Sequence, residues 1–139
     1  MIRSGYRLLS HTADLLVEAR AGNFPSLCAV SVEALFSLLT DRRRVRRILK
    51  KSIELPVAPP EELFLSVLRG SLLLFFLDQF LVRDADAVMT GDKIVVTLEG
   101  EPMDTARHSM KLELKAVTAH ALAIESGPSG FRGRFVVDV

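Results

Sequence analysis

Three carboxylates at the two ends of the chain are the strongest candidates for chemistry. Asp14 begins a stretch of alternating apolar and polar residues, and Asp138 precedes Val139, the last residue, which adds a terminal carboxylate. The alternation places both aspartates on polar faces of predicted strands, so they project to the same side if these strands pair. Carboxylate oxygens favour Ca²⁺, Mg²⁺ or Mn²⁺ over zinc. The pattern indicates a divalent-cation site; the alternative is that Asp14 caps a turn and Asp138 is a solvated strand end.

Three other residues could take part in chemistry. Asp41 ends the predicted first helix, where the helix dipole disfavours an acid, so it has either a function or a turn-forming role. Lys115 lies among small residues on one face of a predicted strand. There it either reaches a substrate, phosphate or carboxylate, or is a surface lysine that pairs with Glu113 or another acid. His120 lies on the opposite, apolar face, which predicts a hydrogen-bonded histidine in the core. No two histidines have the spacing of a zinc-binding pair.

A strongly basic segment occupies residues 42–51. It contains seven Lys and Arg residues and no acid, whereas the rest of the chain is net acidic. Such a run could contact RNA phosphates. It could also protect a strand edge from aggregation, and the lack of interleaved aromatic residues argues against base stacking. The chain has no P-loop, no GxGxxG motif and no GxSxG motif, so nothing indicates a phosphate cradle or a serine nucleophile.

Composition indicates an ordinary globular domain. The 139 residues predict one domain, residues 1–139, and 49% hydrophobic residues are enough for a real core. The single Cys28 excludes an internal disulfide and a cysteine-based zinc site, and fits the reducing cytosol. No apolar stretch follows Met1, so we expect no signal peptide. Residues 63–82 are very apolar, but Arg69 and Asp78 interrupt them, which favours a core helix over a membrane span.

Hydrophobic periodicity and turn signals predict two helices and seven strands. The first helix begins at the N-cap Asn23 and ends near residues 40–41, and the second runs from Pro59 to about Leu81. Gly91-Asp92 predicts a tight hairpin. The predicted strands are residues 6–10, 15–21, 45–57, 85–90, 93–98, 111–124 and 131–139, with a polar connector at 101–110. The order β-β-α-β-α-β-β-β-β predicts a compact, layered α+β domain.

Five short motifs, taken in order, resemble those of the archease family. The match runs nearly end to end, and it is the order and spacing of the motifs that make it specific. The motifs are His11-Thr12-Ala13-Asp14, Leu39-Thr40-Asp41, Gly100-Glu101-Pro102-Met103-Asp104 followed by Arg107-His108, Lys115-Ala116-Val117-Thr118-Ala119-His120, and Val137-Asp138-Val139.

The resemblance implies an accessory protein of an RtcB-type RNA ligase in tRNA splicing or RNA repair. Such a protein is not an enzyme; it promotes the metal- and GTP-dependent guanylylation of the ligase and its repeated turnover. The resemblance implies that Asp14, Asp138 and Val139 bind a divalent cation. Calcium is the expected ion, with magnesium or manganese as alternatives. It makes Asp41 and Lys115 further functional positions. It also implies a cytoplasmic location, contact with tRNA or other RNA through the ligase, and no membrane or DNA partner.

Two other classes of function remain open from the residues themselves. One is a small metal-dependent hydrolase or nuclease that uses Asp14, Asp138 and a histidine base. The other is an RNA-binding or chaperone module that works through residues 42–51. Turnover of RNA without a partner would favour the first, and strongly salt-dependent RNA binding would favour the second.

Overall fold

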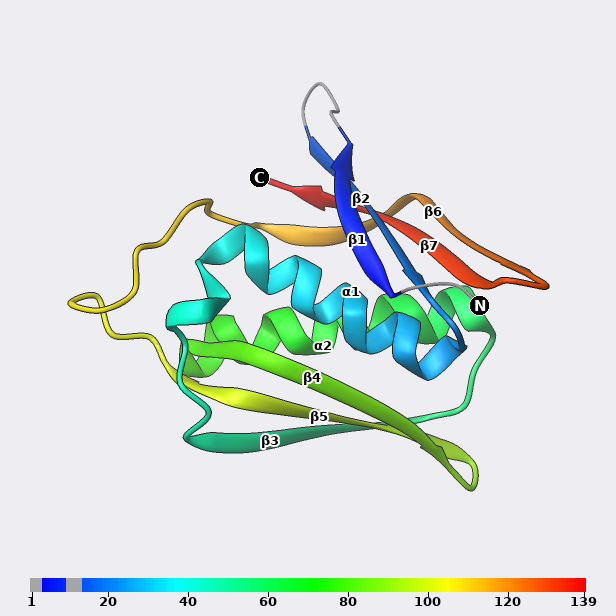
Figure 1. Cartoon of the computed structure of the whole chain (residues 1–139), viewed down its shortest axis with the longest axis horizontal. Helices are drawn as coiled ribbons and strands as arrows, with labels where there is room; N and C mark the ends of the chain where they lie inside the picture. Colours follow the sequence, from blue (N-terminus) through cyan, green and yellow to red (C-terminus); the bar gives the residue numbers. More distant parts are fainter. Residues whose placement is uncertain (1–3, 10–13) are drawn as a thin grey trace.

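The computed structural model describes residues 4–9 and 14–139, and contains two β-sheets with two helices between them (Figure 1). The motif residues His11, Thr12 and Ala13 lie outside the described residues. The elements are β1 (Gly5–Leu9), β2 (Asp14–Ala21), α1 (Phe24–Leu39), the 3₁₀ turn η1 (Arg42–Arg44), β3 (Leu49–Pro56), α2 (Pro60–Asp78), β4 (Phe80–Thr90), β5 (Lys93–Pro102), β6 (Ala116–Gly127) and β7 (Gly130–Asp138).

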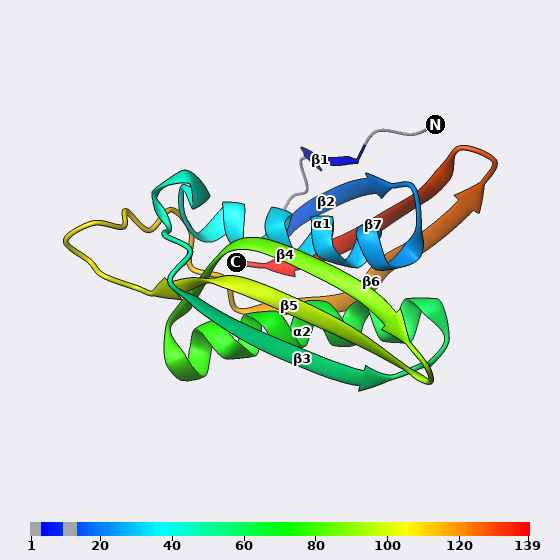
Figure 2. The same ribbon diagram turned by 60° about the horizontal axis from the view of Figure 1, so that its bottom comes forward.

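The strands form two antiparallel sheets. The first has the order β1-β2-β7-β6 and the second the order β3-β5-β4. Figure 2 shows β3, β5 and β4 side by side in front of the helices. Each helix contacts both sheets, so the layers are sheet, helices, sheet. The predicted α+β class and the predicted order of helices and strands are confirmed.

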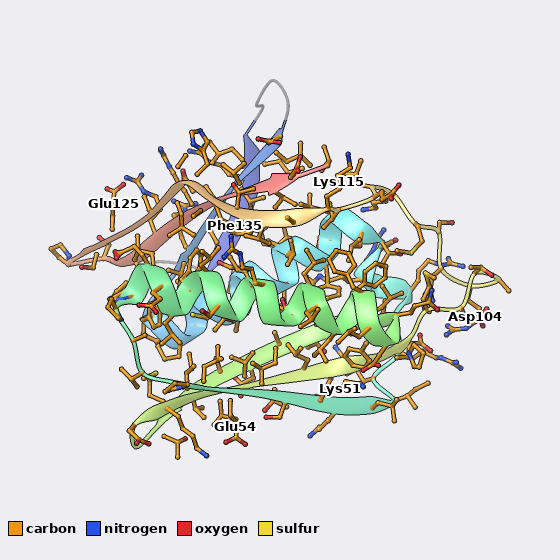
Figure 3. All side chains as sticks on the ribbon, turned by 180° about the vertical axis from the view of Figure 1, so that it is seen from behind. Lys51, Glu54, Asp104, Lys115, Glu125 and Phe135 are labelled. Carbon is orange, nitrogen blue, oxygen red and sulfur yellow. The ribbon has the colours of Figure 1, made fainter. Side chains whose placement is uncertain are left out.

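The core lies in the helical layer and on the inner faces of the two sheets. Its largest fully buried side chains include Phe36, Phe64, Phe80 and Phe135. The rings of Phe64 on α2 and Phe135 on β7 pack edge to face with centroids 5.9 Å apart. Figure 3 shows the labelled Phe135 between the first sheet and α2. This contact fixes α2 against the strand that carries Asp138.

The first helix begins as its sequence predicts. The Asn23 Oδ1 accepts a hydrogen bond from the Ser26 N–H at 2.9 Å, and Pro25 lies in the first turn. An N-cap of this kind stabilises a helix by about 1 kcal/mol. At the other end Thr40 caps the helix, and its Oγ1 donates to the Ser109 carbonyl at 2.8 Å. The end of α1 is therefore joined to the connector that precedes β6.

The second helix ends three residues earlier than predicted. It stops at Asp78 because Gln79 adopts a left-handed conformation (φ 52°) and its N–H closes onto the Phe75 carbonyl at 2.8 Å. Phe80, Leu81 and Val82 then start β4 and are completely buried. An apolar run gives no local sign of where a buried helix becomes a buried strand. No helix in the described part of the chain is long and apolar enough to cross a membrane.

Two strand predictions start too early. The strand expected at residues 45–57 begins at Leu49, because η1 and an irregular stretch precede it. The strand expected at 111–124 begins only at Ala116. Its neighbour β7 ends at Asp138, which is the pairing partner of Ala116, so the residues before Ala116 have no strand to pair with. The last bond to β7 is the one from Lys115 N–H to the Asp138 carbonyl at 2.8 Å.

The prediction that His120 lies in the core is wrong. The pairing of β6 with β7 shifts register between Thr118 and Ala123, so the intervening residues leave the ladder. Ala121 within this bulge has φ 56°, and His120 is exposed. A bulge inserts residues that the two-residue period of a strand cannot anticipate. The buried histidine of the described chain is instead His108, in the connector.

Candidate functional site

Asp14 and Asp138 lie directly opposite each other at the ends of β2 and β7. Residues opposite each other in an antiparallel pair project to the same face, with Cβ atoms about 5 Å apart. Both side chains are half-buried. Val139 follows Asp138 directly, at the end of the chain that Figure 1 marks C, beyond β7. We call the group Asp14, Asp138 and Val139 the carboxylate corner. The pairing that strand alternation made possible is thus present in the fold.

The chemistry of the carboxylate corner suits a cation. Like charges directly opposite each other destabilise a sheet, and a cation between them would remove that repulsion. Within residues 4–9 and 14–139, no three side chains of His, Cys, Asp or Glu are grouped closely enough to hold a metal ion. The two aspartates offer carboxylate oxygens at the corner, and such donors fit Ca²⁺, Mg²⁺ or Mn²⁺.

Lys115 lies beside the carboxylate corner. Its backbone N–H donates to the Asp138 carbonyl at 2.8 Å, and the next residue, Ala116, is the β6 partner of Asp138. The side chain of Lys115 is exposed (Figure 3). The surface pairing with Glu113 is absent, since no ion pair of the described residues joins the two. Within the described residues the Lys115 ammonium group forms no ion pair with any other acid either.

Asp41 forms the turn after α1 and has a partner of its own. Its Oδ1 accepts the Arg43 N–H at 3.1 Å, and the Arg43 guanidinium donates to both carboxylate oxygens at 3.0 Å. These bonds, from the guanidinium first and then the backbone, lower the pKa of Asp41 to about 2. It is therefore ionised throughout the physiological range.

A polar hollow surrounds Asp41. Its volume is about 560 Å³, and it is lined by Tyr6, Ser37, Thr40, Asp41, Arg42, Arg43 and Lys111. Among the described residues, the lining of this hollow does not include Asp14, Asp138 or Lys115. The structure thus brings Lys115 to the carboxylate corner and places Asp41 in a hollow of its own.

A buried glutamate holds the connector that leads toward the carboxylate corner. Glu101 is 2% exposed and accepts the Arg46 N–H at 2.7 Å, the Arg46 Nε–H at 3.1 Å, a bond from Arg107 and the His108 Nε2 at 3.0 Å. Burial acts to raise the pKa of Glu101, but these hydrogen bonds outweigh it and lower the pKa to about 2. Because His108 Nδ1 accepts the Asp104 N–H at 2.9 Å, the proton of a neutral His108 lies on Nε2.

The Glu101 cluster was missed by sequence reasoning, which treated residues 101–110 as a polar connector. Glu101 and His108 both belong to a motif that carries the family resemblance, and that was the available signal. The connector is joined to α1 by the Thr40 hydroxyl and by the bond from Lys111 N–H to the Leu39 carbonyl at 2.8 Å. These contacts hold the beginning of the segment 111–115, whose other end is bonded to Asp138.

The basic segment is largely neutralised by acids of the same molecule. Five of its seven cationic side chains form ion pairs: Arg42 with Glu33, Arg43 with Asp41, Arg46 with Glu101, Arg47 with Asp84, and Lys51 with Asp78. Arg42 also donates to the carbonyl of Arg83 and to Ser37. The segment therefore fastens the α1–β3 connection to the body of the domain, while the side chains of Arg43, Arg46 and Arg47 stay more than half exposed.

The lone cysteine is part of the core. Cys28 on α1 is completely buried, and burial raises the pKa of its thiol to about 12. A thiol in this state is neither a nucleophile nor a metal ligand at neutral pH.

Comparison with known proteins decides the family. The sequence profile of the Archease protein family matches residues 6–139. The chain belongs to the archease family. The match spans both sheets and both helices, and it includes Asp14, Asp41, Lys115, Asp138 and Val139.

Individual archeases are similar to this chain over most of its length. It is 25% identical over 124 residues to protein archease of Pyrococcus abyssi, with 86% of this chain and 87% of that one covered. It is 29% identical over 135 residues to protein archease of Methanopyrus kandleri, with 94% and 96% covered. The solution structure of Methanobacterium thermoautotrophicum protein 1598 has the same fold, with a TM-score of 0.79 at 22% identity over 97% of this chain and 99% of that one.

Proposed function

We propose that this archease activates an RtcB-type RNA ligase in the cytoplasm, by promoting its GTP-dependent guanylylation and turnover in tRNA splicing or RNA repair. It does so as an accessory protein, without catalysing ligation. The observation that carries the proposal is the placement of Asp14 opposite Asp138, beside Val139, in a chain whose archease match covers residues 6–139. The proposal includes contact with tRNA or other RNA through the ligase, and no role for DNA or a membrane.

The carboxylate corner would hold the divalent cation, which we expect to be calcium. A bound cation would supply positive charge against the phosphates that react during guanylylation. Asp14 and Asp138 would bind it from β2 and β7, and Val139 would add a third donor. Lys115, whose backbone bonds to Asp138, would add a cationic side chain at the same edge. Asp41, ionised and paired with Arg43, would act at the separate hollow.

Guanylylation of the ligase is the direct test of this function. The purified protein should join no RNA alone but should accelerate GTP-dependent labelling of an RtcB-type ligase. We expect Asp14→Ala and Asp138→Ala each to reduce that acceleration at least about tenfold, because each removes a proposed ligand. The matched control is Glu125→Ala, which removes an exposed acid of β6 that pairs with Arg132.

Two results would contradict the proposal. If both aspartate variants fold and still accelerate guanylylation fully, the carboxylate corner is not the site. If the protein alone turns over RNA in the presence of the metal, the hydrolase interpretation takes precedence.

Removing one negative charge from the carboxylate corner should distinguish the effect of charge repulsion on stability from the effect of metal binding. In EDTA we expect Asp138→Asn to be more stable than wild type by about 0.2–1 kcal/mol, because a like-charge pair is relieved. Added Ca²⁺ should raise the melting temperature of wild type but not of the variant, since a ligand that binds the folded state stabilises it. Thermal unfolding with and without Ca²⁺ measures both effects. Equal calcium responses in the two proteins would remove Asp138 from the ligand set.

A further inference from the structure

An exposed apolar surface lies next to the carboxylate corner. It comprises Leu73, Phe76 and Leu77 on the second half of α2, with Met110 and Leu112 from the segment before β6. Leu77 is 71% exposed, and the other four are 38–51% exposed. The spacing of the helical members places them on one side of α2. Large apolar patches of this kind mark interaction sites in proteins.

Two hollows share the side chain of Phe76 and extend this surface toward Lys115. The first, of about 450 Å³, is lined by Leu39, Phe75, Phe76, Met103, Met110, Lys111, Leu112, Glu113 and Leu114. The second, of about 300 Å³, is lined by Arg69, Leu72, Leu73, Phe76, Lys115, Ala116 and Val117. Figure 3 shows the labelled Lys115 where the segment before β6 passes above α2. An occupant of both hollows would therefore run from the end of α2 to the edge of the carboxylate corner.

The backbone along this surface is open for pairing. The segment is tied at one end by Lys111 N–H to the Leu39 carbonyl and at the other by Lys115 N–H to the Asp138 carbonyl, both at 2.8 Å. Between these ties, within the part of the chain that the structure describes, residues 112–114 make no backbone hydrogen bond. An extended peptide can add to such a stretch through its main chain and place alternate side chains in adjacent pockets.

The charge of the surface indicates which kind of segment would complement it. Arg69, Lys111 and Lys115 line the hollows, and Glu113 is the one acid among the lining residues. None of these three cations forms an ion pair within residues 4–9 and 14–139. A complementary segment is apolar in its centre and acidic at its flanks.

We propose that an extended segment of the ligase, apolar in its centre and acidic at its flanks, binds along residues 112–114 and inserts its side chains beside Phe76. This inference rests on the proposed function and adds the docking surface to it. The segment ends at Lys115 and thereby brings the ligase to the carboxylate corner. The corner and the docking surface are then two parts of one interface, the first for chemistry and the second for affinity.

Binding of the ligase to full-length variants tests the surface. We expect Leu73→Gln with Leu77→Gln to weaken the affinity at least about tenfold, because two apolar contacts are lost while the helix propensity is retained. The matched control is Val88→Gln with Met89→Gln on β4, whose side chains are similarly exposed but belong to the second sheet and not to this apolar surface. Calorimetry measures affinity, and guanylylation at saturating variant should recover, since the carboxylate corner is intact.

A second pair of variants tests strand pairing in particular. Glu113→Pro removes one backbone donor and should weaken binding, whereas Glu113→Ala removes an acid from a basic surface and should bind as well or better. Melting temperatures establish that each variant is folded.

Three outcomes would overturn these proposals. If the variant with both leucine substitutions binds the ligase as tightly as wild type, and wild type still activates the ligase, the docking surface is wrong but the proposed function stands. Failure of wild type to bind and activate the ligase overturns the proposed function as well. A dimer of this chain that the leucine substitutions dissociate would assign the surface to a second copy and overturn the proposal.

Discussion

Gly100→Ala should destabilise the domain by about 3 kcal/mol, the upper end of the cost of overpacking. Gly100 lies in the central strand β5, between Leu49 on β3 and Val82 on β4. A Cβ at this position would lie 1.8 Å from the Leu81 carbonyl oxygen and 2.9 Å from the Leu81 carbonyl carbon. Both atoms belong to the backbone, so rotation of a side chain cannot relieve the clash, and β4 has to move away from β5.

Thermal or urea unfolding measures this effect, which corresponds to a fall in melting temperature on the order of 10 °C. The matched control is Gly22→Ala. A Cβ there meets no atom within 4 Å, so the substitution should be neutral or stabilise by up to about 1 kcal/mol through the unfolded chain. Equal stabilities of the two variants would show that β4 and β5 are less closely packed at Gly100 than the structure has them.

Glu101→Gln should cost about 3 kcal/mol, because bonds to a charged acceptor are among the strongest in a protein. The amide keeps the size of the side chain but cannot accept all the donors from Arg46, Arg107 and His108 that converge on the carboxylate. The control is Glu125→Gln, whose exposed pair with Arg132 should contribute less than about 1 kcal/mol. Similar losses in the two variants would assign the Glu101 cluster little role in stability.

The same cluster predicts a pH dependence with a definite sign. The pKa of Glu101 is lowered from 4.5 to about 2 in the folded protein. The folded state therefore binds this proton more weakly than the unfolded state, and the stabilisation is fully present above about pH 4.5. It should be lost as the pH falls from about 4.5 toward 2. Wild type should lose more stability over this interval than Glu101→Gln, as urea unfolding at several pH values would show.

Local sequence signals predicted the elements whose boundaries are set by neighbouring residues. The Asn23 cap and the Gly91-Asp92 turn lie where expected, because both depend on residues within one turn of the chain. The boundary between α2 and β4 was missed because the apolar residues Phe80–Val82 are buried in either conformation. The start of β6 was missed because it depends on where β7 ends, which is a property of the sheet and not of the segment.

The candidate site shows the same difference between features that neighbouring residues set and features that distant contacts set. Alternation placed Asp14 and Asp138 on polar faces, but only the strand order β1-β2-β7-β6 makes them opposite neighbours. Glu101 was missed because its partner Arg46 is 55 residues away in the sequence. His108 is buried in the same cluster, although its own partner Glu101 is only seven residues away. Long-range pairing of this kind leaves no periodic trace in a single sequence.

The position of β7 between β2 and β6 determines the order in which the molecule can assemble. The sheet β3-β5-β4 pairs strands that all lie within residues 49–102, whereas β2 pairs with a strand that begins at residue 130. Closing so long a loop is slow, because its entropy is lost before the contacts form. During synthesis the first sheet cannot be completed until β7 has been made, after both helices and the strands of the second sheet. Asp14 and Asp138 can therefore meet only after both helices and all the other strands have been synthesised.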